Sequence, residues 1–120
     1  MKLVGIPAYN EEKTIGDMIK KSLKHSDRVI VVDDGSTDNT AKIAKQSGAT
    51  VISHQKNQGY GAAVITLFDR ARDENADILT IIDGDGQHDP EQIPLLINAL
   101  QENDVDVVIG SRFLQSSSDT

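Results

Sequence analysis

The sequence predicts an α/β fold with a mainly parallel sheet that is covered by helices on both faces. Two observations predict it. Short aliphatic runs alternate along the chain with segments of helical periodicity, and the runs are continuous rather than interleaved with polar residues. Continuous runs are typical of strands buried on both faces of a parallel sheet. The five expected strands are residues 3–6 (ended by Pro7), 28–32, 50–53, 78–82 and 105–109.

Helical segments are expected in the four gaps between these strands. Asn10, followed by two glutamates, is expected near the start of the first helix, and Ser36 is expected to cap the second. Residues 40–47 form the weakest helical pattern, and Gly48 is expected to end it. Asp89 and Pro90 have the pattern of a helix start, so Asp89 is read as structural. Helical spacing is clearest in three sets: Ile15, Met18, Ile19 and Leu23; Val64, Leu67, Phe68 and Ala71; Ile93, Leu96, Ile97 and Leu100.

Composition excludes several classes of function. The chain has 120 residues, no cysteine, 12 basic and 19 acidic residues, and a formal net charge of -7. One domain is expected at this length, without disulfides, thiolate metal ligands or a nucleic-acid surface. The longest aliphatic runs, such as residues 29–32, are too short to span a bilayer, which needs about 20 apolar residues. The chain begins directly with a strand-like run, so no signal peptide is expected and a cytoplasmic location is predicted.

Polar or glycine-rich loops follow four of the five expected strands, at residues 7–11, 33–36, 83–87 and 110–112. In open α/β sheets, ligands bind beyond the carboxyl ends of the strands. The four loops are therefore expected to project from one edge of the sheet and to form the functional site there.

Asp83 and Asp85 are the strongest candidates for metal binding. Two carboxylates at positions i and i+2 of an extended chain point the same way and repel each other unless a cation lies between them. Oxygen ligands of this kind suit Mg2+ or Mn2+, and Gln87 adds a neutral oxygen. Gly84 and Gly86 would let a diphosphate approach the backbone closely. The alternative is that both aspartates only form turns.

The other loops carry more ambiguous candidates. Asp33 and Asp34 could accept hydrogen bonds from a base or a ribose, or could form an Asp turn before a helix. Tyr9 could line a nucleoside site or simply pack, and Glu11 could act in binding or only favour a helix start. Arg112 could pair with a phosphate or remain a solvated cation.

The histidines and several motifs give no separate site. The three histidines lack metal-ligand spacing; His25 and His54 are expected at the surface, and His88, beside the acidic loop, is left open. The Gly59-Tyr60-Gly61 segment is expected to open the third helix, so it is not a dinucleotide fingerprint. The sequence contains no P-loop and no nucleophile elbow.

Taken together, the loops resemble those of the family 2 inverting glycosyltransferases of the GT-A fold. Within that family the chain is most similar to the polyprenyl-phosphate sugar transferases, which use dolichyl-phosphate-type acceptors. The resemblance covers residues 3–113. The motifs that carry it occur in order at residues 6–12, 32–38, 57–61, 83–88 and 110–112.

The resemblance implies a role for each loop. The loop at residues 7–11 would contact the nucleoside of a UDP- or GDP-sugar, and the loop after the second strand would contact its base and ribose. The loop at residues 83–87 would contact the ribose, the diphosphate and a Mg2+ or Mn2+ ion. Asp85 and Gln87, with Asp83, would hold the metal, and Arg112 would face the donor or acceptor phosphates. Asp83, Asp85 and Arg112 are the implied catalytic residues. The implied nucleotide-sugar-binding residues are Pro7, Tyr9, Glu11, Val32, Asp34, Asp83, Gly84 and Asp85.

The resemblance also implies partners and an extent. The acceptor would be a lipid phosphate or a saccharide, with peripheral contact at the cytoplasmic membrane face. Members of the family are longer and carry acceptor-side elements after the equivalent of Arg112. Residues 1–114 are therefore expected to be the nucleotide-sugar-binding part, with little transfer activity alone, and residues 115–120 a frayed tail.

Three alternatives are weighed against this interpretation. A receiver-type signalling domain has a similar length and an acidic Mg2+ pocket, but its Asp pair follows the first strand and a Lys follows the fifth. A sugar-nucleotide pyrophosphorylase needs a basic, glycine-rich loop after the first strand, where this chain has Pro-Ala-Tyr-Asn-Glu-Glu. A non-catalytic nucleotide-binding domain remains as the third alternative.

Overall fold

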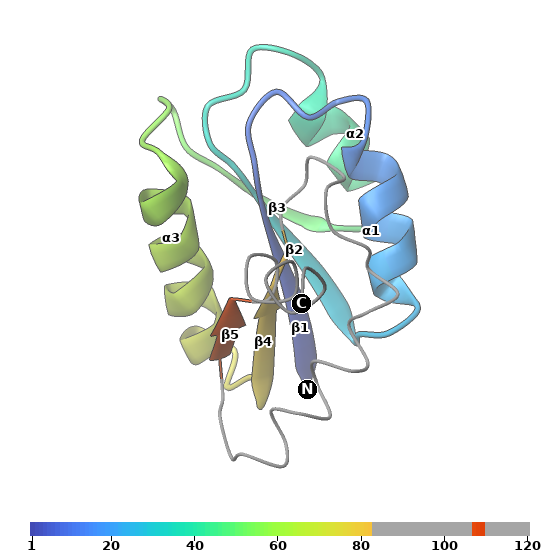
Figure 1. Cartoon of the computed structure of the whole chain (residues 1–120), viewed down its shortest axis with the longest axis vertical. Coiled ribbons are helices and arrows are strands. Elements are labelled where there is room, and N and C mark those ends of the chain that lie inside the picture. Colours follow the sequence, from blue (N-terminus) through green and yellow to red (C-terminus); the bar gives the residue numbers. More distant parts are fainter. Residues whose placement is uncertain (83–106, 110–120) are drawn as a thin grey trace, which may run out of the picture.

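A computed structural model of the chain describes residues 1–82 and 107–109. In these residues five strands form a single sheet in the order β3-β2-β1-β4-β5, and all four neighbouring pairs are parallel (Figure 1). The predicted α/β class and parallel sheet are confirmed. The strands are β1 (Lys2–Ala8), β2 (Arg28–Asp33), β3 (Thr50–Ser53), β4 (Ile78–Ile81) and β5 (Val107–Ile109).

Helices cover both faces of this sheet, as predicted. Helices α1 (Ile15–Leu23) and α2 (Thr40–Gln46) lie on one face, and α3 (Tyr60–Asp73) lies on the other (Figure 1). Alternate strand residues face opposite layers: Val4 packs in the cluster with α1, whereas Leu3 packs in the cluster with α3. The core thus consists of two aliphatic layers separated by the sheet, which explains the continuous apolar runs.

The first strand is longer than expected, because it continues through Pro7 to Ala8. The Gly5 carbonyl accepts a hydrogen bond from the amide of Ile82, which follows β4, so the backbone polar groups of Gly5 face β4. The backbone nitrogen of Pro7, two residues later, faces the same side. The pairing of β1 with β4 ends at Gly5 and Ile81. The missing amide of Pro7 therefore lies beyond the last rung of that ladder, where a proline costs no strand hydrogen bond.

Helix starts also differ from expectation. Helix α1 begins at Ile15, after Thr14, and Asn10 lies in the preceding loop with a left-handed φ of 52°. Helix α2 begins after Asn39 rather than after Ser36, whose hydroxyl is used by another loop. Gly48 ends α2 with a φ of 104°, as predicted. The fourth helix, its Asp89-Pro90 start and the tail at 115–120 lie outside the described residues.

The strand order creates a topological switch point between β1 and β4. From β1 the chain passes to its neighbour β2, whereas β4 pairs with β5 on its other side. Connections after β1 and β4 therefore lead in opposite directions, and a crevice forms in such sheets at the carboxyl ends of these two strands. The functional site is therefore expected at the carboxyl edge, next to β1 and β4.

Candidate functional site

Three loops meet at the carboxyl edge of the sheet within the described residues: residues 9–14 after β1, 34–39 after β2 and 54–59 after β3 (Figure 1). They lie at the end of the molecule opposite the amino terminus. The predicted gathering of loops is thus confirmed for the loops after β1 and β2. The loop after β3 was not predicted, and the predicted loops at 83–87 and 110–112 lie outside the described residues. The loops are joined to one another mainly by side chains that hydrogen-bond to backbone amides.

Asp34 is the centre of the contacts between the second and third loops. It is 4% exposed. Its Oδ1 lies 2.8 Å from His54 Nδ1 and accepts the Gln58 amide at 2.9 Å, while Oδ2 accepts the Gly59 amide at 2.8 Å. Burial alone would raise the pKa of Asp34, but these hydrogen bonds outweigh it and hold the pKa below the usual 3.8. The side chain is therefore a buried carboxylate that fixes the start of α3.

Gly35 allows the second and third loops to come this close. Its φ is +76°, and a Cβ at this position would lie 2.5 Å from the Asn57 nitrogen and 2.7 Å from the Lys56 carbonyl carbon. Both neighbours are backbone atoms, which cannot move aside without shifting the loop. The Asp-Gly pair after β2 is thus required by a backbone-to-backbone approach.

His54 is not a surface residue, contrary to expectation. Its side chain is 12% exposed, and its Nε2 lies 2.9 Å from the Thr66 hydroxyl of α3. Its amide donates to the Asp33 carbonyl at 2.9 Å, which extends the β2–β3 ladder by one residue. Because Ile52 packs towards α3, His54, two residues later, faces the same layer. The period of two in β3 was the sequence signal for this burial.

The first and second loops are joined in both directions. The Asn10 amide donates to the Ser36 hydroxyl at 2.8 Å, and Asn10 Oδ1 accepts the Thr37 amide at 2.8 Å. The Glu11 amide donates to the Thr40 hydroxyl at 2.9 Å. Asn tolerates the left-handed conformation that this exchange requires. Asn10 and Ser36 are therefore loop-joining residues rather than helix caps.

Asp38 supports the same junction from the second loop. It accepts the Thr40 amide at 2.9 Å and the Thr40 hydroxyl, while the Asn39 amide donates to Glu12 Oε2 at 2.9 Å. Burial acts to raise the pKa of Asp38, yet the hydrogen bonds from Thr40 lower it overall. The first loop is thereby held against the start of α2.

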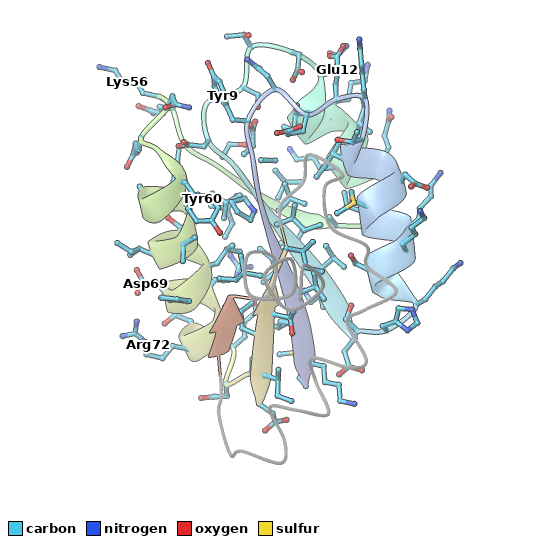
Figure 2. The ribbon with its side chains drawn as sticks, viewed as in Figure 1. Tyr9, Glu12, Lys56, Tyr60, Asp69 and Arg72 are labelled. Carbon is cyan, nitrogen blue, oxygen red and sulfur yellow. The ribbon has the colours of Figure 1, made fainter. Side chains whose placement is uncertain are left out.

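The structure separates the predicted binding residues into buried and exposed sets. Val32 is fully buried in the layer facing α3, and Pro7 is buried within β1, so their side chains belong to the core. Tyr9 is 45% exposed and lies at the edge together with Glu12 (Figure 2). Glu11 is half-buried in the same loop. The roles of these residues in nucleotide binding stay predictions.

The predicted metal and phosphate ligands lie outside the described residues, namely Asp83, Gly84, Asp85, Gln87 and Arg112, as does His88. The chain reaches them through Ile82, whose amide donates to the Gly5 carbonyl at 3.0 Å beside β1. Within residues 1–82 and 107–109, no cluster of three metal-ligating side chains is present.

Sequence reasoning passed over two exposed side chains near this edge. Lys56 follows β3 in the third loop, and Tyr60 begins α3 with 41% exposure (Figure 2). Lys56 is a cation on an edge whose other charged groups are mostly acidic. The sequence signal for both residues was their position directly after the third strand, where a loop reaches the same edge of the sheet as the loops after the other strands.

Comparisons with known proteins agree with this geometry. The model of the family described as glycosyl transferase family 2 matches residues 3–120. The chain belongs to glycosyl transferase family 2. This confirms the family indicated by the loop motifs, and with it the expectation of an enzyme family over a receiver domain or a pyrophosphorylase.

Curated relatives in family 2 include enzymes that act on lipid phosphates. A UDP-N-acetylglucosamine–dolichyl-phosphate N-acetylglucosaminyltransferase of Methanococcus voltae is 38% identical over 125 residues, covering 89% of this chain and 50% of the relative. A dodecaprenyl-phosphate galacturonate synthase of Rhizobium johnstonii is 32% identical, with 89% of this chain and 34% of the relative covered. The chain thus spans half or less of the length of these two relatives.

Solved structures in the same comparison confirm the fold. Glucosyl-3-phosphoglycerate synthase of Mycobacterium tuberculosis, in complex with Mn2+, UDP and glucosyl-3-phosphoglycerate, matches with a TM-score of 0.69 and 34% identity. The match covers 83% of this chain and 39% of that one. The same enzyme has also been solved with Mg2+ and UDP. Within the part of this chain that is described, no helix is long and apolar enough to cross a bilayer.

Proposed function

We propose that this chain binds the nucleoside diphosphate part of a nucleotide-sugar at the carboxyl edge of the sheet. The observation that carries the proposal is the meeting of three loops there, next to the switch point between β1 and β4. Membership of family 2 and the neighbour solved with UDP and Mn2+ support it. Pro7, Tyr9, Glu11, Val32 and Asp34 form the nucleoside side of the proposed site.

For the three buried members of that group, Pro7, Val32 and Asp34, contact would involve the backbone rather than the side chain. Val32 has no exposed side-chain surface, and the Asp34 carboxylate already accepts hydrogen bonds from His54, Gln58 and Gly59. Tyr9, by contrast, offers an exposed aromatic face on which a base or ribose can pack. The proposed site thus combines a fixed backbone with a few exposed side chains.

The phosphate side of the proposed site consists of Asp83, Gly84, Asp85, Gln87 and Arg112. Their chemistry fits a divalent cation and a diphosphate: carboxylate and amide oxygens suit Mg2+ or Mn2+, glycine permits close approach, and arginine pairs with phosphate. The cation would neutralise charge on the leaving diphosphate. In a chain with a net charge of -7, it would also offset repulsion of an anionic donor.

The reaction proposed for the complete protein is transfer of the sugar to a polyprenyl phosphate with inversion. An acceptor phosphate oxygen forms a bond to the anomeric carbon as the bond from that carbon to the donor phosphate breaks, and the nucleoside diphosphate departs. A single displacement inverts the anomeric configuration. A phosphate oxygen is already anionic and needs no general base, whereas a hydroxyl acceptor would need one. Such an acceptor implies peripheral contact at the cytoplasmic membrane face.

Calorimetric titration with UDP and with GDP, each with and without Mn2+, tests the binding step. Saturable binding that requires Mn2+ is expected, and it should be abolished by Asp85→Asn but kept by Asp69→Asn, a matched change on the exposed face of α3. Binding of neither nucleotide would contradict the proposal. Transfer of labelled sugar to a polyprenyl phosphate by the complete protein, with product anomer determined by NMR, tests the reaction.

A further inference from the structure

A hydrogen-bonded chain of three side chains connects β2, the end of β3 and α3 beneath the carboxyl edge. His54 Nδ1 lies 2.8 Å from Asp34 Oδ1, and His54 Nε2 lies 2.9 Å from Thr66 Oγ1. The Thr66 hydroxyl also lies 3.1 Å from the Ala62 carbonyl, one turn earlier in α3. Both ring nitrogens of His54 are therefore engaged, and the imidazole is held at both ends.

The Asp34 carboxylate satisfies backbone donors at the start of α3. Gly59 immediately precedes the first residue of that helix, and its own side chain can supply no cap. Amides at a helix start lack partners within the helix and need an acceptor from elsewhere. Asp34 supplies one from the loop after β2 by accepting the Gln58 and Gly59 amides. The place where α3 begins is thus set by the orientation of this carboxylate.

His54 is the side chain that hydrogen-bonds to the Asp34 carboxylate among the described residues. Asp34 Oδ1 is shared between the imidazole and the Gln58 amide, so the imidazole constrains the orientation of the carboxylate. The single proton of the Thr66 hydroxyl goes either to the Ala62 carbonyl or to the ring, and its oxygen can accept from the ring. The hydroxyl can therefore hold the imidazole as a donor or as an acceptor.

We propose that His54 is a positioning residue of the nucleotide site, which acts through Asp34 on the backbone of residues 57–59 without touching the nucleotide. This inference rests on the proposed function for its effect on binding. The loop it holds leads to Tyr60 and carries Lys56, two of the exposed side chains on this part of the edge. A loop that must be ordered when the ligand binds weakens affinity, so preordering by His54 strengthens it.

Two substitutions at His54 and one at Thr66 test the inference. His54→Leu removes both polar contacts, whereas His54→Asn retains a short N–H donor towards Asp34. Thr66→Val removes only the hydroxyl that holds the far side of the ring. Thr50→Val, which removes a hydroxyl that accepts from Arg28 at the opposite edge, is the matched control. Amide hydrogen exchange of Gln58 and Gly59 and the Kd for UDP and GDP with Mn2+ are measured for each.

His54→Leu is expected to speed exchange at both amides and to weaken nucleotide binding about tenfold, the loss of one charge-assisted hydrogen bond. His54→Asn and Thr66→Val should fall between this variant and the wild type, and Thr50→Val should match the wild type in both measurements. Unchanged exchange in His54→Leu overturns the inference, as does weaker binding without faster exchange, which would indicate direct contact with the nucleotide.

The two proposals fail in different ways. If the unmodified chain binds neither nucleotide, the proposed function fails, while amide exchange still decides whether His54 positions the loop. If the chain binds nucleotide and His54→Leu binds equally well, only the inference about His54 fails.

Discussion

The two edges of the sheet are held together by contacts that differ mainly in their exposure to water. At the carboxyl edge, buried or half-buried side chains such as Asp34 and Asp38 accept hydrogen bonds from backbone amides of other segments. At the amino edge, ion pairs join side chains or the terminus: Asp77 pairs with the amino group of Met1, and Glu74 with Arg28. The Asp34 side chain is 5% exposed, whereas that of Asp77 is 77% exposed.

The difference indicates at which edge the polar contacts fix the conformation of the backbone. A hydrogen bond from a buried amide to a carboxylate fixes the backbone, and breaking it leaves a buried donor without a partner. An exposed ion pair is screened by water and contributes little. Substitutions should therefore be costly at the carboxyl edge and mild at the amino edge. Their relative sizes test whether the carboxyl edge is the preorganised site.

The largest effect is expected from Gly35→Ala. The added Cβ would meet backbone atoms of Lys56 and Asn57 at 2.7 and 2.5 Å, in a residue with φ of +76°. Strain and overpacking together should lower the free energy of unfolding by about 3–5 kcal/mol. Urea denaturation measures it.

Gly59→Ala is the matched control for this prediction. Its φ is +100°, but a Cβ there would meet nothing within 4 Å. Only backbone strain applies, so the free energy of unfolding should fall by about 1–2 kcal/mol. Equal costs for the two variants would mean that close approach of the second and third loops is not a constraint, and the contrast between the edges would weaken.

Much of the fold was predictable because burial on both faces of a parallel strand leaves an aliphatic run in the sequence. The strand at Thr50–Ser53 matched its observed bounds, and the apolar positions of α3 were predicted by helical spacing. The prediction that Pro7 ends β1 is wrong, because the strand continues to Ala8. Whether a proline can stay in a strand depends on where the neighbouring ladder stops, which is a property of the pairing between β1 and β4.

The site was predictable only in outline. Loop motifs indicated the edge and the family, and the aspartate at position 34 was singled out. Its partners could not be predicted, because the amides of Gln58 and Gly59 come from a loop that is 24 and 25 residues away in sequence. The prediction that His54 lies at the surface is wrong for a similar reason, since its contact with Thr66 exists only after α3 packs on the sheet.

Asp34→Asn is expected to have the next largest effect and to lower the free energy of unfolding by about 2–3 kcal/mol at neutral pH. In this variant an amide NH2 replaces one acceptor oxygen of a buried carboxylate. The hydrogen bonds hold the pKa of Asp34 below 3.8 in the folded state. The folded protein then binds fewer protons than the unfolded chain, so this stability is present above pH 3.8 and lost as pH falls through the folded pKa.

The difference between wild type and Asp34→Asn should therefore narrow as the pH falls below 3.8. Urea denaturation of both proteins between pH 7 and pH 3 measures it. Asp33→Asn, which alters the neighbouring carboxylate that accepts only the Ser36 amide among the bonds described here, should show a smaller cost. A pH-independent difference would contradict the role of the Asp34 charge.

The smallest effects are expected at the amino edge. Glu74→Gln weakens ion pairs with Arg28 and Arg70, in which the glutamate side chain is 16% exposed. We expect it to lower the free energy of unfolding by about 1 kcal/mol. Asp69→Asn removes a pair with Arg72 on the exposed face of α3 (Figure 2), and below about 0.5 kcal/mol is expected. High salt should reduce the difference at Asp69 further, because exposed charges are screened, and should reduce the difference at the partly buried Glu74 less. A cost at Glu74 as large as that of Asp34→Asn would show that ion pairs at the amino edge also hold the backbone, since loss of a screened surface contact cannot produce it.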